Sequence, residues 1–168
     1  MIISRTPYRI SFFGGGTDYP EWYFKYGGQV LCSAIDKYVY ISCRYLPPFF
    51  EHRLRLVYSK IEFCQNVNQI IHPSAKAVLK YLGIKKDIEI HYDGDLPARS
   101  GIGSSSAFTV GMLKALSKYN NQNLSKKKLR DSSIFIEQKI IKETVGSQDQ
   151  TIATYGGFNH IIFKKNGQ

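Results

Sequence analysis

The sequence predicts an α+β domain in which a mixed β-sheet packs with helices. Residues 2–13, 37–46 and 87–92 alternate apolar and polar side chains, as half-buried strands do. Residues 104–119 place apolar side chains at helical spacing, and a second helical pattern begins near Ser125. Strands and helices are mixed without strict alternation, which favours an α+β fold over a doubly wound parallel sheet. The length of 168 residues is close to that of one domain.

Glycines and a proline mark the predicted end of the first strand and the start of the first helix. The strand over 2–13 ends at the run Gly14-Gly15-Gly16, because consecutive glycines break a strand. A short helix is expected next, with Thr17 or Asp18 near its cap and Pro20 in its first turn.

The middle of the chain predicts a strand, a helix and a further strand. Residues 37–46 separate their apolar and polar side chains onto two faces, and we expect 54–59 to be the antiparallel neighbour of that strand. A helix spans roughly 74–82 and stops at Gly83. The alternating residues 87–92 then form a strand.

Helices dominate the remaining sequence. The helix over 104–119 buries its apolar side and exposes lysines. The helix that begins near Ser125 starts with a lysine run, which we interpret as a solvated helix start. Its expected inward side chains are Leu129, Ile136 and Ile140. Residues 157–164 predict a final strand.

The composition disfavours several functional classes. No apolar run approaches the ~18 residues of a membrane span, and the N-terminus lacks the apolar core of a signal peptide, so we expect a cytoplasmic protein without a membrane partner. The three cysteines show no C-x-x-C spacing and predict neither a disulfide framework nor a zinc site. The net charge of +10 attracts anions, but no nucleic-acid-binding motif accompanies it. We therefore expect no nucleic-acid partner.

The strongest local signal is the segment 97–107, Pro-Ala-Arg-Ser-Gly-Ile-Gly-Ser-Ser-Ser-Ala, between a predicted strand and a predicted helix. Gly101 and Gly103 allow the backbone to approach a ligand closely, and the N-terminus of a helix attracts phosphate. The segment lacks the Gly-Lys-Ser/Thr of a Walker P-loop, and Ser106 replaces the third glycine of the dinucleotide fingerprint. A glycine turn followed by a serine N-cap is the alternative.

Two further segments carry charged side chains near glycines. Arg9 lies on the first strand, and Asp18 follows the glycine run, where it could bind sugar hydroxyls or merely cap the next helix. Glu137 lies late on a helix, and Asp149 follows a turn that starts at Gly146. Two carboxylates with separate tasks are what magnesium-assisted phosphoryl transfer needs, although a surface Glu and a turn Asp would look the same.

The three segments, in this order, resemble the GHMP kinases, a family that includes galactokinase, homoserine kinase and mevalonate kinase. Residues 97–107 are similar to the family's nucleotide motif, and Pro7-x-Arg9 through Asp18 to its substrate motif. The segment Gly-Ser-Gln-Asp-Gln at 146–150 is similar to its catalytic turn. The resemblance implies that residues 1–168 form the family's N-terminal, ribosomal-protein-domain-2-like unit. It also implies that the C-terminal ferredoxin-like domain is a missing partner.

The resemblance implies a role for each matching residue. ATP phosphates would be cradled by Gly101, Gly103, Ser104 and Ser106, with Mg²⁺ held by Ser105 and Glu137. Asp149 would orient or deprotonate the acceptor hydroxyl, and Arg9 would steady it and meet the transferred phosphoryl group. The sugar would contact Arg9, Gly15, Gly16, Thr17, Asp18 and Asp149.

The substrate implied by the resemblance is a sugar phosphate. Galactokinases carry Glu-His where this sequence has Gly15-Gly16, which leaves room for a longer sugar. The Gly-Gly-Gly-Thr-Asp-Tyr-Pro form at 14–20 is similar to that of D-glycero-D-manno-heptose 7-phosphate kinases. The implied reaction phosphorylates the anomeric hydroxyl to give a 1,7-bisphosphate for bacterial surface-polysaccharide biosynthesis. A fucokinase or another GHMP sugar kinase, and a non-catalytic sugar- or nucleotide-binding relative, are the alternatives.

Overall fold

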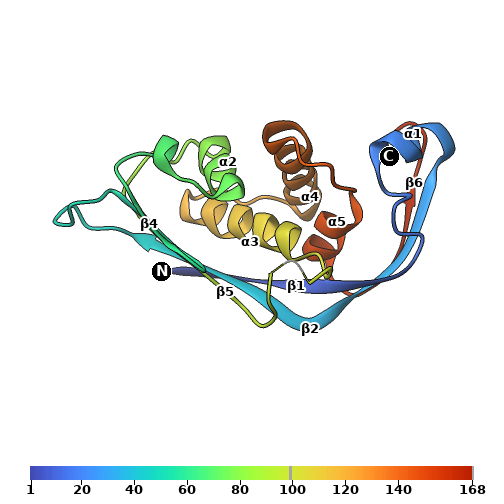
Figure 1. Ribbon diagram of the computed structural model, residues 1–168, viewed down its shortest axis with the longest axis horizontal. Coiled ribbons are helices and arrows are strands. Elements are labelled where there is room, and N and C mark those ends of the chain that lie inside the picture. Colours follow the sequence, from blue (N-terminus) through green and yellow to red (C-terminus); the bar gives the residue numbers. More distant parts are fainter. Residues whose placement is uncertain (99, 168) are drawn as a thin grey trace.

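The computed structural model describes residues 1–98 and 100–167, which form a six-stranded mixed sheet packed with helices (Figure 1). The strand order is β1 (Ile2–Phe13), β2 (Gly28–Tyr45), β5 (Ile88–Gly94), β3 (Leu54–Val57) and β4 (Ile61–Cys64). The sixth strand, β6 (Phe158–Phe163), pairs with the first half of β2. Parallel pairing occurs between β3 and β5, and the other described pairs are antiparallel. The predicted α+β class with a mixed sheet is confirmed.

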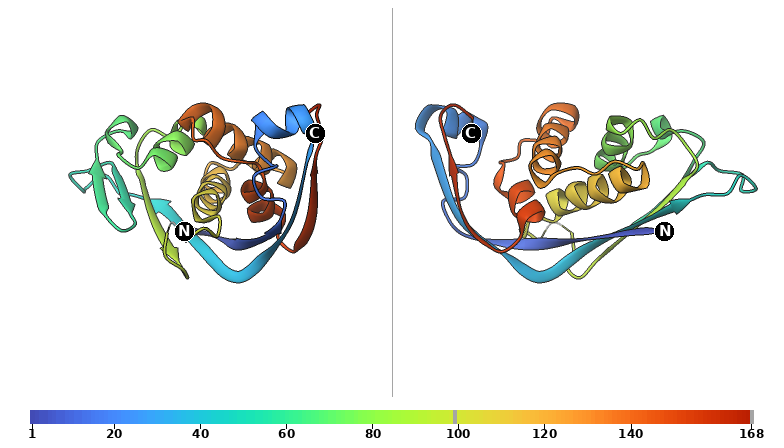
Figure 2. Two further views of the ribbon diagram at one scale, coloured as in Figure 1. Left: turned by 45° about the vertical axis from the view of Figure 1, so that its right-hand side comes forward. Right: turned by 180° about the vertical axis from the view of Figure 1, so that it is seen from behind.

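Helices α2 to α5 cover one face of this sheet (Figures 1 and 2). Their bounds are α2 (Pro73–Tyr81), α3 (Ser104–Tyr119), α4 (Lys126–Phe135) and α5 (Gln148–Tyr155). The central helix, α3, packs on β1 and β2 and also contacts α2, α4 and α5. Because Val110, Met112 and Leu113 of α3 are at most 1% exposed, this helix is anchored in the core and its first turn has a fixed place.

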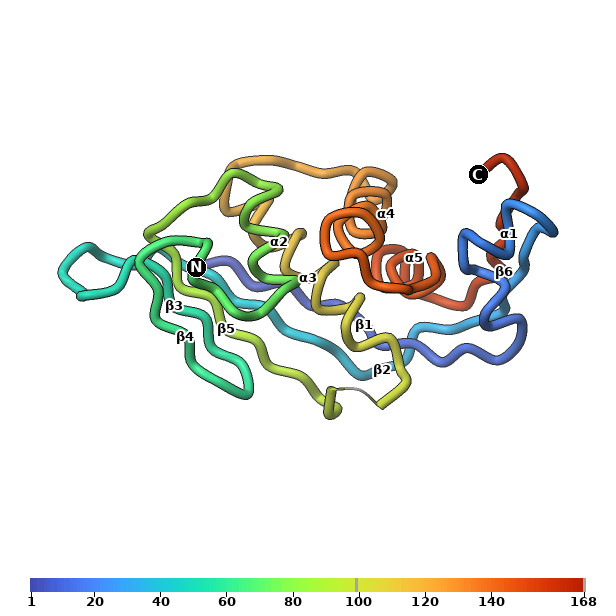
Figure 3. The backbone as a smooth tube through the Cα atoms, turned by 45° about the horizontal axis from the view of Figure 1, so that its top comes forward, coloured from blue at the N-terminus to red at the C-terminus, as the bar shows by residue number. Residues whose placement is uncertain are grey.

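An N-terminal helix and the C-terminal strand lie together at one end of the molecule (Figure 3). There α1 (Pro20–Tyr26) and β6 lie together, apart from α2 to α5 (Figure 3). Pro20 occupies the first turn of α1, as predicted. The predicted cap is wrong, because Tyr19 is the N-cap residue and makes no side-chain cap bond. The side chains of Thr17 and Asp18 are used elsewhere, as described below.

Two further predictions are wrong. Residues 54–59 do not neighbour 37–46, because β5 lies between them and β3 pairs with β4 and β5. Ile140 is 41% exposed, although Leu129 and Ile136 are buried as predicted. From Ile136 the helix continues as a π-helical segment, Ile136–Ile141, whose wider turns rotate the later side chains away from the 3.6-residue spacing.

The remaining predicted elements are confirmed to within a few residues, except that the strand predicted over 37–46 begins nine residues earlier, at Gly28. Cys32, Cys43 and Cys64 are free, buried thiols. In the part of the chain that the structure describes, no helix is both long enough and apolar enough to cross a lipid bilayer.

Candidate active site

The turn between β5 and α3 presents a glycine-rich backbone at the N-terminus of α3. Gly101 and Gly103 have φ values of +74° and +75°, the left-handed region that L side chains rarely adopt. Gly103 is the N-cap residue, so the first turn of α3 consists of Ser104, Ser105 and Ser106. The first amides of a helix lack intrahelical partners and carry partial positive charge, which suits an anion. Arg99, part of the same motif, lies outside the described residues.

A cavity of about 1030 Å³ opens beside this end of α3. Ser104, Ser105 and Phe108 line one side, and the chain after β5, the β3–β4 hairpin and the start of α2 form the others. His72 of α2 stacks on Phe108 with 4.6 Å between ring centroids, and burial lowers the pKa of its imidazole. Burial thus favours the uncharged form of this imidazole. The cavity combines a flat apolar wall with polar groups at a helix end, which suits a planar ring joined to an anionic group.

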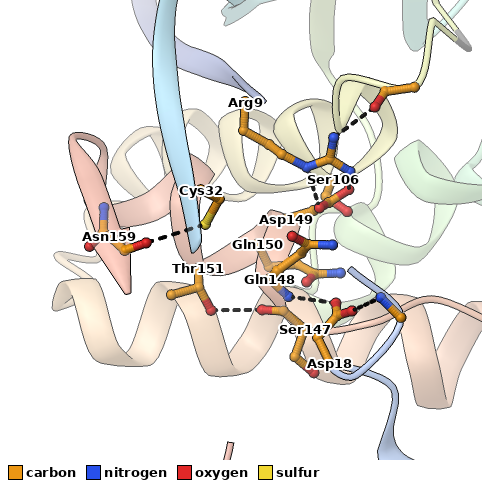
Figure 4. Close-up of polar contacts among 12 residues, drawn as sticks. Arg9, Asp18, Cys32, Ser106, Ser147, Gln148, Asp149, Gln150, Thr151 and Asn159 are labelled. Carbon is orange, nitrogen blue, oxygen red and sulfur yellow. Dashed lines mark hydrogen bonds and ion pairs between the residues drawn. The ribbon is translucent and has the colours of Figure 1, made fainter. Parts of the chain in front are cut away.

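Arg9 and Asp149 form an ion pair beside the glycine turn (Figure 4). The Arg9 guanidinium donates to both Asp149 carboxylate oxygens, from Nε at 2.7 Å and from Nη2 at 2.9 Å. Its Nη1 donates to the Gly101 carbonyl at 2.7 Å, and its backbone N–H donates to the Ile102 carbonyl at 3.1 Å. Gly103 approaches both partners closely, since a Cβ there would lie 3.1 Å from Arg9 Cγ and 3.2 Å from Asp149 Oδ2. The structure thus joins β1, the glycine turn and α5.

The loop from Gly14 to Asp18 is held by its own polar side chains. The Thr17 hydroxyl lies 2.8 Å from the Gly14 carbonyl and 3.0 Å from the Gln29 carbonyl, and it accepts a hydrogen bond from Gln29 N–H at 3.0 Å. The Asp18 side chain is buried and accepts from backbone amides. Contacts with bound sugar stay a prediction for both residues, and the structure shows that their polar atoms also hold the loop in place. They bind within the protein because the loop packs against β2 and the start of α5.

A smaller cavity of about 420 Å³ lies between this loop and the glycine turn. Arg9, Ser11, Gly15 and Gly101 line it, together with Gln148. Gly15 therefore lies where the sequence placed a sugar contact, whereas Gly16 is not among the residues that line the cavity. The Gln148 side chain was not among the predicted site residues, because α5 was expected to be only a turn.

Glu137 is fully buried under the first turn of α3. Its Oε2 accepts a hydrogen bond from the Ser106 hydroxyl at 2.8 Å and another from Gln150 Nε2. Its Oε1 is buried and has no hydrogen-bond partner among the described residues. Burial raises the pKa of this carboxyl, against the hydrogen bonds from Gln150 and Ser106.

Comparison with known proteins decides the family. The family model described as "GHMP kinases N terminal domain" matches residues 68–157, which is more than half of the chain. The chain belongs to the GHMP kinases. Its fold places the glycine turn, Arg9 and Asp149 next to one another.

Individual relatives cover the whole of this GHMP domain. The D-glycero-alpha-D-manno-heptose 7-phosphate kinase of Campylobacter jejuni is 29% identical over 98% of the chain and 51% of that protein. A galactokinase of Chloroflexus aurantiacus is 27% identical over 95% of the chain and 42% of that protein. The crystal structure of a D-glycero-D-manno-heptose 1-phosphate kinase from Bacteroides thetaiotaomicron matches with a TM-score of 0.90 at 26% identity, over 100% of the chain and 58% of that structure. The chain thus spans about half the length of these relatives.

The residues of this GHMP kinase domain fit the divalent cation that the family's chemistry implies. Glu137 offers an unpaired carboxylate oxygen, a hard donor of the kind that Mg²⁺ prefers, and a hydroxyl lies beside it. No group of three or more His, Cys, Asp or Glu side chains is suitably gathered in the described ranges, so phosphate oxygens or water would have to complete the coordination.

The structure separates Ser105, which was predicted to hold a metal ion with Glu137, from its neighbour Ser106. The Ser105 side chain is exposed toward the larger cavity, whereas the Ser106 hydroxyl contacts Glu137. Consecutive helical residues point about 100° apart, so the two cannot share one direction. Ser105 stays a prediction as a metal ligand, and Ser106, predicted only for the phosphate cradle, is added to the Glu137 site.

Proposed function

We propose that residues 1–168 form the ATP- and sugar-binding domain of an ATP-dependent sugar kinase, which a second GHMP domain completes. The observation that carries this proposal is the contact of Arg9 with both Asp149 and the glycine turn. This contact puts a candidate proton acceptor beside the backbone that would hold the nucleotide phosphates. Nucleotide would occupy the cavity next to Ser104 and Ser105, and sugar the smaller cavity next to Gly15 and Gln148.

Each charged group would have a distinct task in phosphoryl transfer. Asp149 would orient the acceptor hydroxyl and take its proton, since its carboxylate is partly accessible and is fixed by two hydrogen bonds. Arg9 would hold Asp149 and offer positive charge where the phosphoryl group passes. The amides at the start of α3 would bind the nucleotide phosphates.

The divalent ion would be held by Glu137 with Ser105 or Ser106, together with the nucleotide phosphates. When bound, it would neutralise charge on the transferring phosphoryl group. Glu137 Oε1 is available for this contact because Ser106 and Gln150 both use the other carboxylate oxygen.

A heptose phosphate is the substrate class that we favour. Two of the relatives are named as kinases of heptose phosphates, and the net charge of +10 suits an anionic sugar. Gly15 adds no side chain to the smaller cavity, which leaves space for a seven-carbon sugar. The proposed reaction is phosphorylation of the anomeric hydroxyl of D-glycero-D-manno-heptose 7-phosphate, for nucleotide-heptose and surface-polysaccharide synthesis.

The test is ADP release by the protein expressed from its complete reading frame. The candidate acceptors are heptose 7-phosphate, heptose 1-phosphate, fucose, galactose and mannose, each with ATP and Mg²⁺. We expect the highest kcat/KM for heptose 7-phosphate. Turnover of an unphosphorylated hexose alone would contradict the substrate, and sugar binding without ADP release would identify a non-catalytic relative.

A further inference from the structure

Glu62 of β4 is a buried carboxylate on the side of the molecule that holds the larger cavity. The β3–β4 hairpin lies beside α2, away from α1 (Figure 3). Glu62 is 7% exposed and shares the helix-covered face of the sheet with Cys64. In the part of the chain that the structure describes, it forms no salt bridge. A buried charge is costly unless hydrogen bonds satisfy it, so its partners show what the side chain does.

Three donors satisfy this carboxylate, and each belongs to a residue of the cavity wall. Oε1 accepts a hydrogen bond from the Tyr58 hydroxyl at 2.9 Å, in the β3–β4 turn, and one from His72 N–H at 3.1 Å. Oε2 accepts a hydrogen bond from Ile71 N–H at 2.6 Å. All three donor residues line the larger cavity, whereas Glu62 is not among its lining residues. One carboxylate behind the wall thus joins the hairpin to the start of α2.

The His72 side chain extends this constraint to α3. Its ring meets the Tyr58 ring edge-on, with 5.0 Å between centroids, and stacks on Phe108. Its Nδ1 accepts a hydrogen bond from Ala75 N–H at 3.4 Å, so the same side chain caps α2. Phe108 lies about one helical turn after Ser104 on α3. The aromatic wall is therefore held in a fixed place relative to the amides at the start of α3.

We propose that Glu62 is a positioning residue that sets the shape of the wall for the nucleotide's base, and thereby the affinity for ATP. The inference rests on the proposed kinase function, which places nucleotide in the larger cavity. A planar base needs a flat apolar surface at a fixed distance from the phosphate site, and the Glu62 hydrogen bonds hold that surface. Glu62 contacts neither Arg9 nor Asp149, so the phosphoryl-transfer step should not depend on it.

The first variant is Glu62→Gln, made in the protein expressed from its complete reading frame. An amide has one acceptor oxygen where the carboxylate has two, so at least one of the three donors must face an NH₂ group. We expect the Kd and the KM for ATP to rise about tenfold, while kcat and the KM for heptose 7-phosphate stay within about twofold. Isothermal titration with ATP and an ADP-release assay measure these constants.

The matched control is Glu89→Gln, which removes a buried carboxylate from the opposite face of the same sheet. Glu89 is 2% exposed and pairs with Arg44 and Arg55, whereas its neighbours Ile88 and Ile90 face the core. Its loss should lower the free energy of unfolding without changing the Kd for ATP. A general effect on stability would make the two variants alike, so a difference in ATP affinity isolates positioning.

Tyr58→Phe tests the same contact without burying a new donor. The variant removes the hydroxyl that Glu62 binds and keeps the ring and both amide contacts, so it should fold even if Glu62→Gln does not. We expect the Kd for ATP to rise about threefold in the wild-type background and to stay unchanged in the Glu62→Gln background, because partners in one hydrogen-bond network do not act additively.

Several results would overturn the proposal. They are an unchanged ATP affinity in Glu62→Gln, equal losses of ATP affinity in Glu62→Gln and Glu89→Gln, and additive losses in the double variant with Tyr58→Phe. If Glu62→Gln does not fold, an unchanged ATP affinity in Tyr58→Phe overturns it. A wild-type protein that binds no ATP would overturn the proposed function as well, whereas ATP binding that is equal in the wild type and Glu62→Gln would overturn the role of Glu62 alone.

Discussion

Arg9 is the residue on which the proposed chemistry most depends. Its guanidinium and backbone bind Asp149, Gly101 and Ile102 at once, and its side chain is only 14% exposed. A planar guanidinium can span these partners because it donates in several fixed directions. A lysine ammonium has one compact charge and cannot reproduce the paired contact.

We therefore expect Arg9→Lys to lower kcat by about 100-fold, the typical effect of misplacing a reacting group by about 1 Å. The measurement is ADP release with saturating ATP and sugar. The matched control is Arg5→Lys on the same strand, because Arg5 is exposed and stacks on Tyr38 away from the site. Equal losses in both variants would show that the effect is not specific to the Arg9–Asp149 pair.

Glu137 makes a prediction about the pH dependence of stability. Burial raises the pKa of its carboxyl in the folded protein, so the folded state holds this proton more tightly than the unfolded state. The free energy of unfolding should therefore fall as the pH rises from the ordinary pKa of a glutamate through the raised value. Glu137→Gln should lack this loss, so it should match the wild type in acid and exceed it above that window.

Chemical denaturation across the pH range measures this difference, with the exposed Glu21→Gln as control. Added Mg²⁺ and nucleotide should stabilise the wild type more than Glu137→Gln, because the variant lacks the carboxylate. If the free energy of unfolding depended on pH in the same way in the wild type and in Glu137→Gln, ionised Glu137 would not destabilise the folded protein.

At the scale of elements, the sequence predicted best where a pattern was long and local. The helix over 104–119 is observed as α3 with the same bounds, because its apolar spacing and the glycine turn that precedes it act within one segment. The pairing of β3 was wrong because alternation says which face is buried and not which strand is adjacent. α5 was read as a turn, since its short pattern is obscured by four polar residues at its start.

The same distinction applies to the site. Arg9, Gly101, Gly103 and Asp149 were predicted and are brought together. The hydrogen bond that Asp18 accepts from the Gln148 amide was not predicted, because this partner is 130 residues away and leaves no local signal. Gln148 and Gln150 were missed for the same reason, although their place on either side of Asp149 in the catalytic turn could have drawn attention to them.

A substitution at Gly103 tests the turn that we propose to hold the nucleotide. Gly103→Ala should destabilise the fold by about 1–2 kcal/mol for the left-handed backbone, and should also weaken ATP binding, because the new Cβ presses on Arg9 and Asp149. Gly83→Ala is the matched control, since Gly83 has a φ of +70° with open space around it. Isothermal titration should find weaker ATP binding in Gly103→Ala alone, and equal affinities would contradict the close packing of this turn.

At the scale of the whole molecule, the fold brings residues that are far apart in the sequence into contact. Arg9 and Asp149 lie 140 residues apart in the sequence and meet beside the start of α3. β1 brings the first, α5 brings the second, and α3 packs against both elements. The sheet therefore serves to place the larger cavity and the smaller cavity on two sides of one glycine turn.

The most direct test of this convergence is Asp149→Asn in the protein from the complete reading frame. We expect ADP release to fall at least about 10³-fold, as for loss of a general base, while the Kd for ATP stays within about threefold. Asp149 is not among the residues that line the larger cavity, so nucleotide binding should not need it. Unchanged ADP release would contradict the role assigned to Asp149, and a large loss of ATP affinity would contradict the roles assigned to the two cavities.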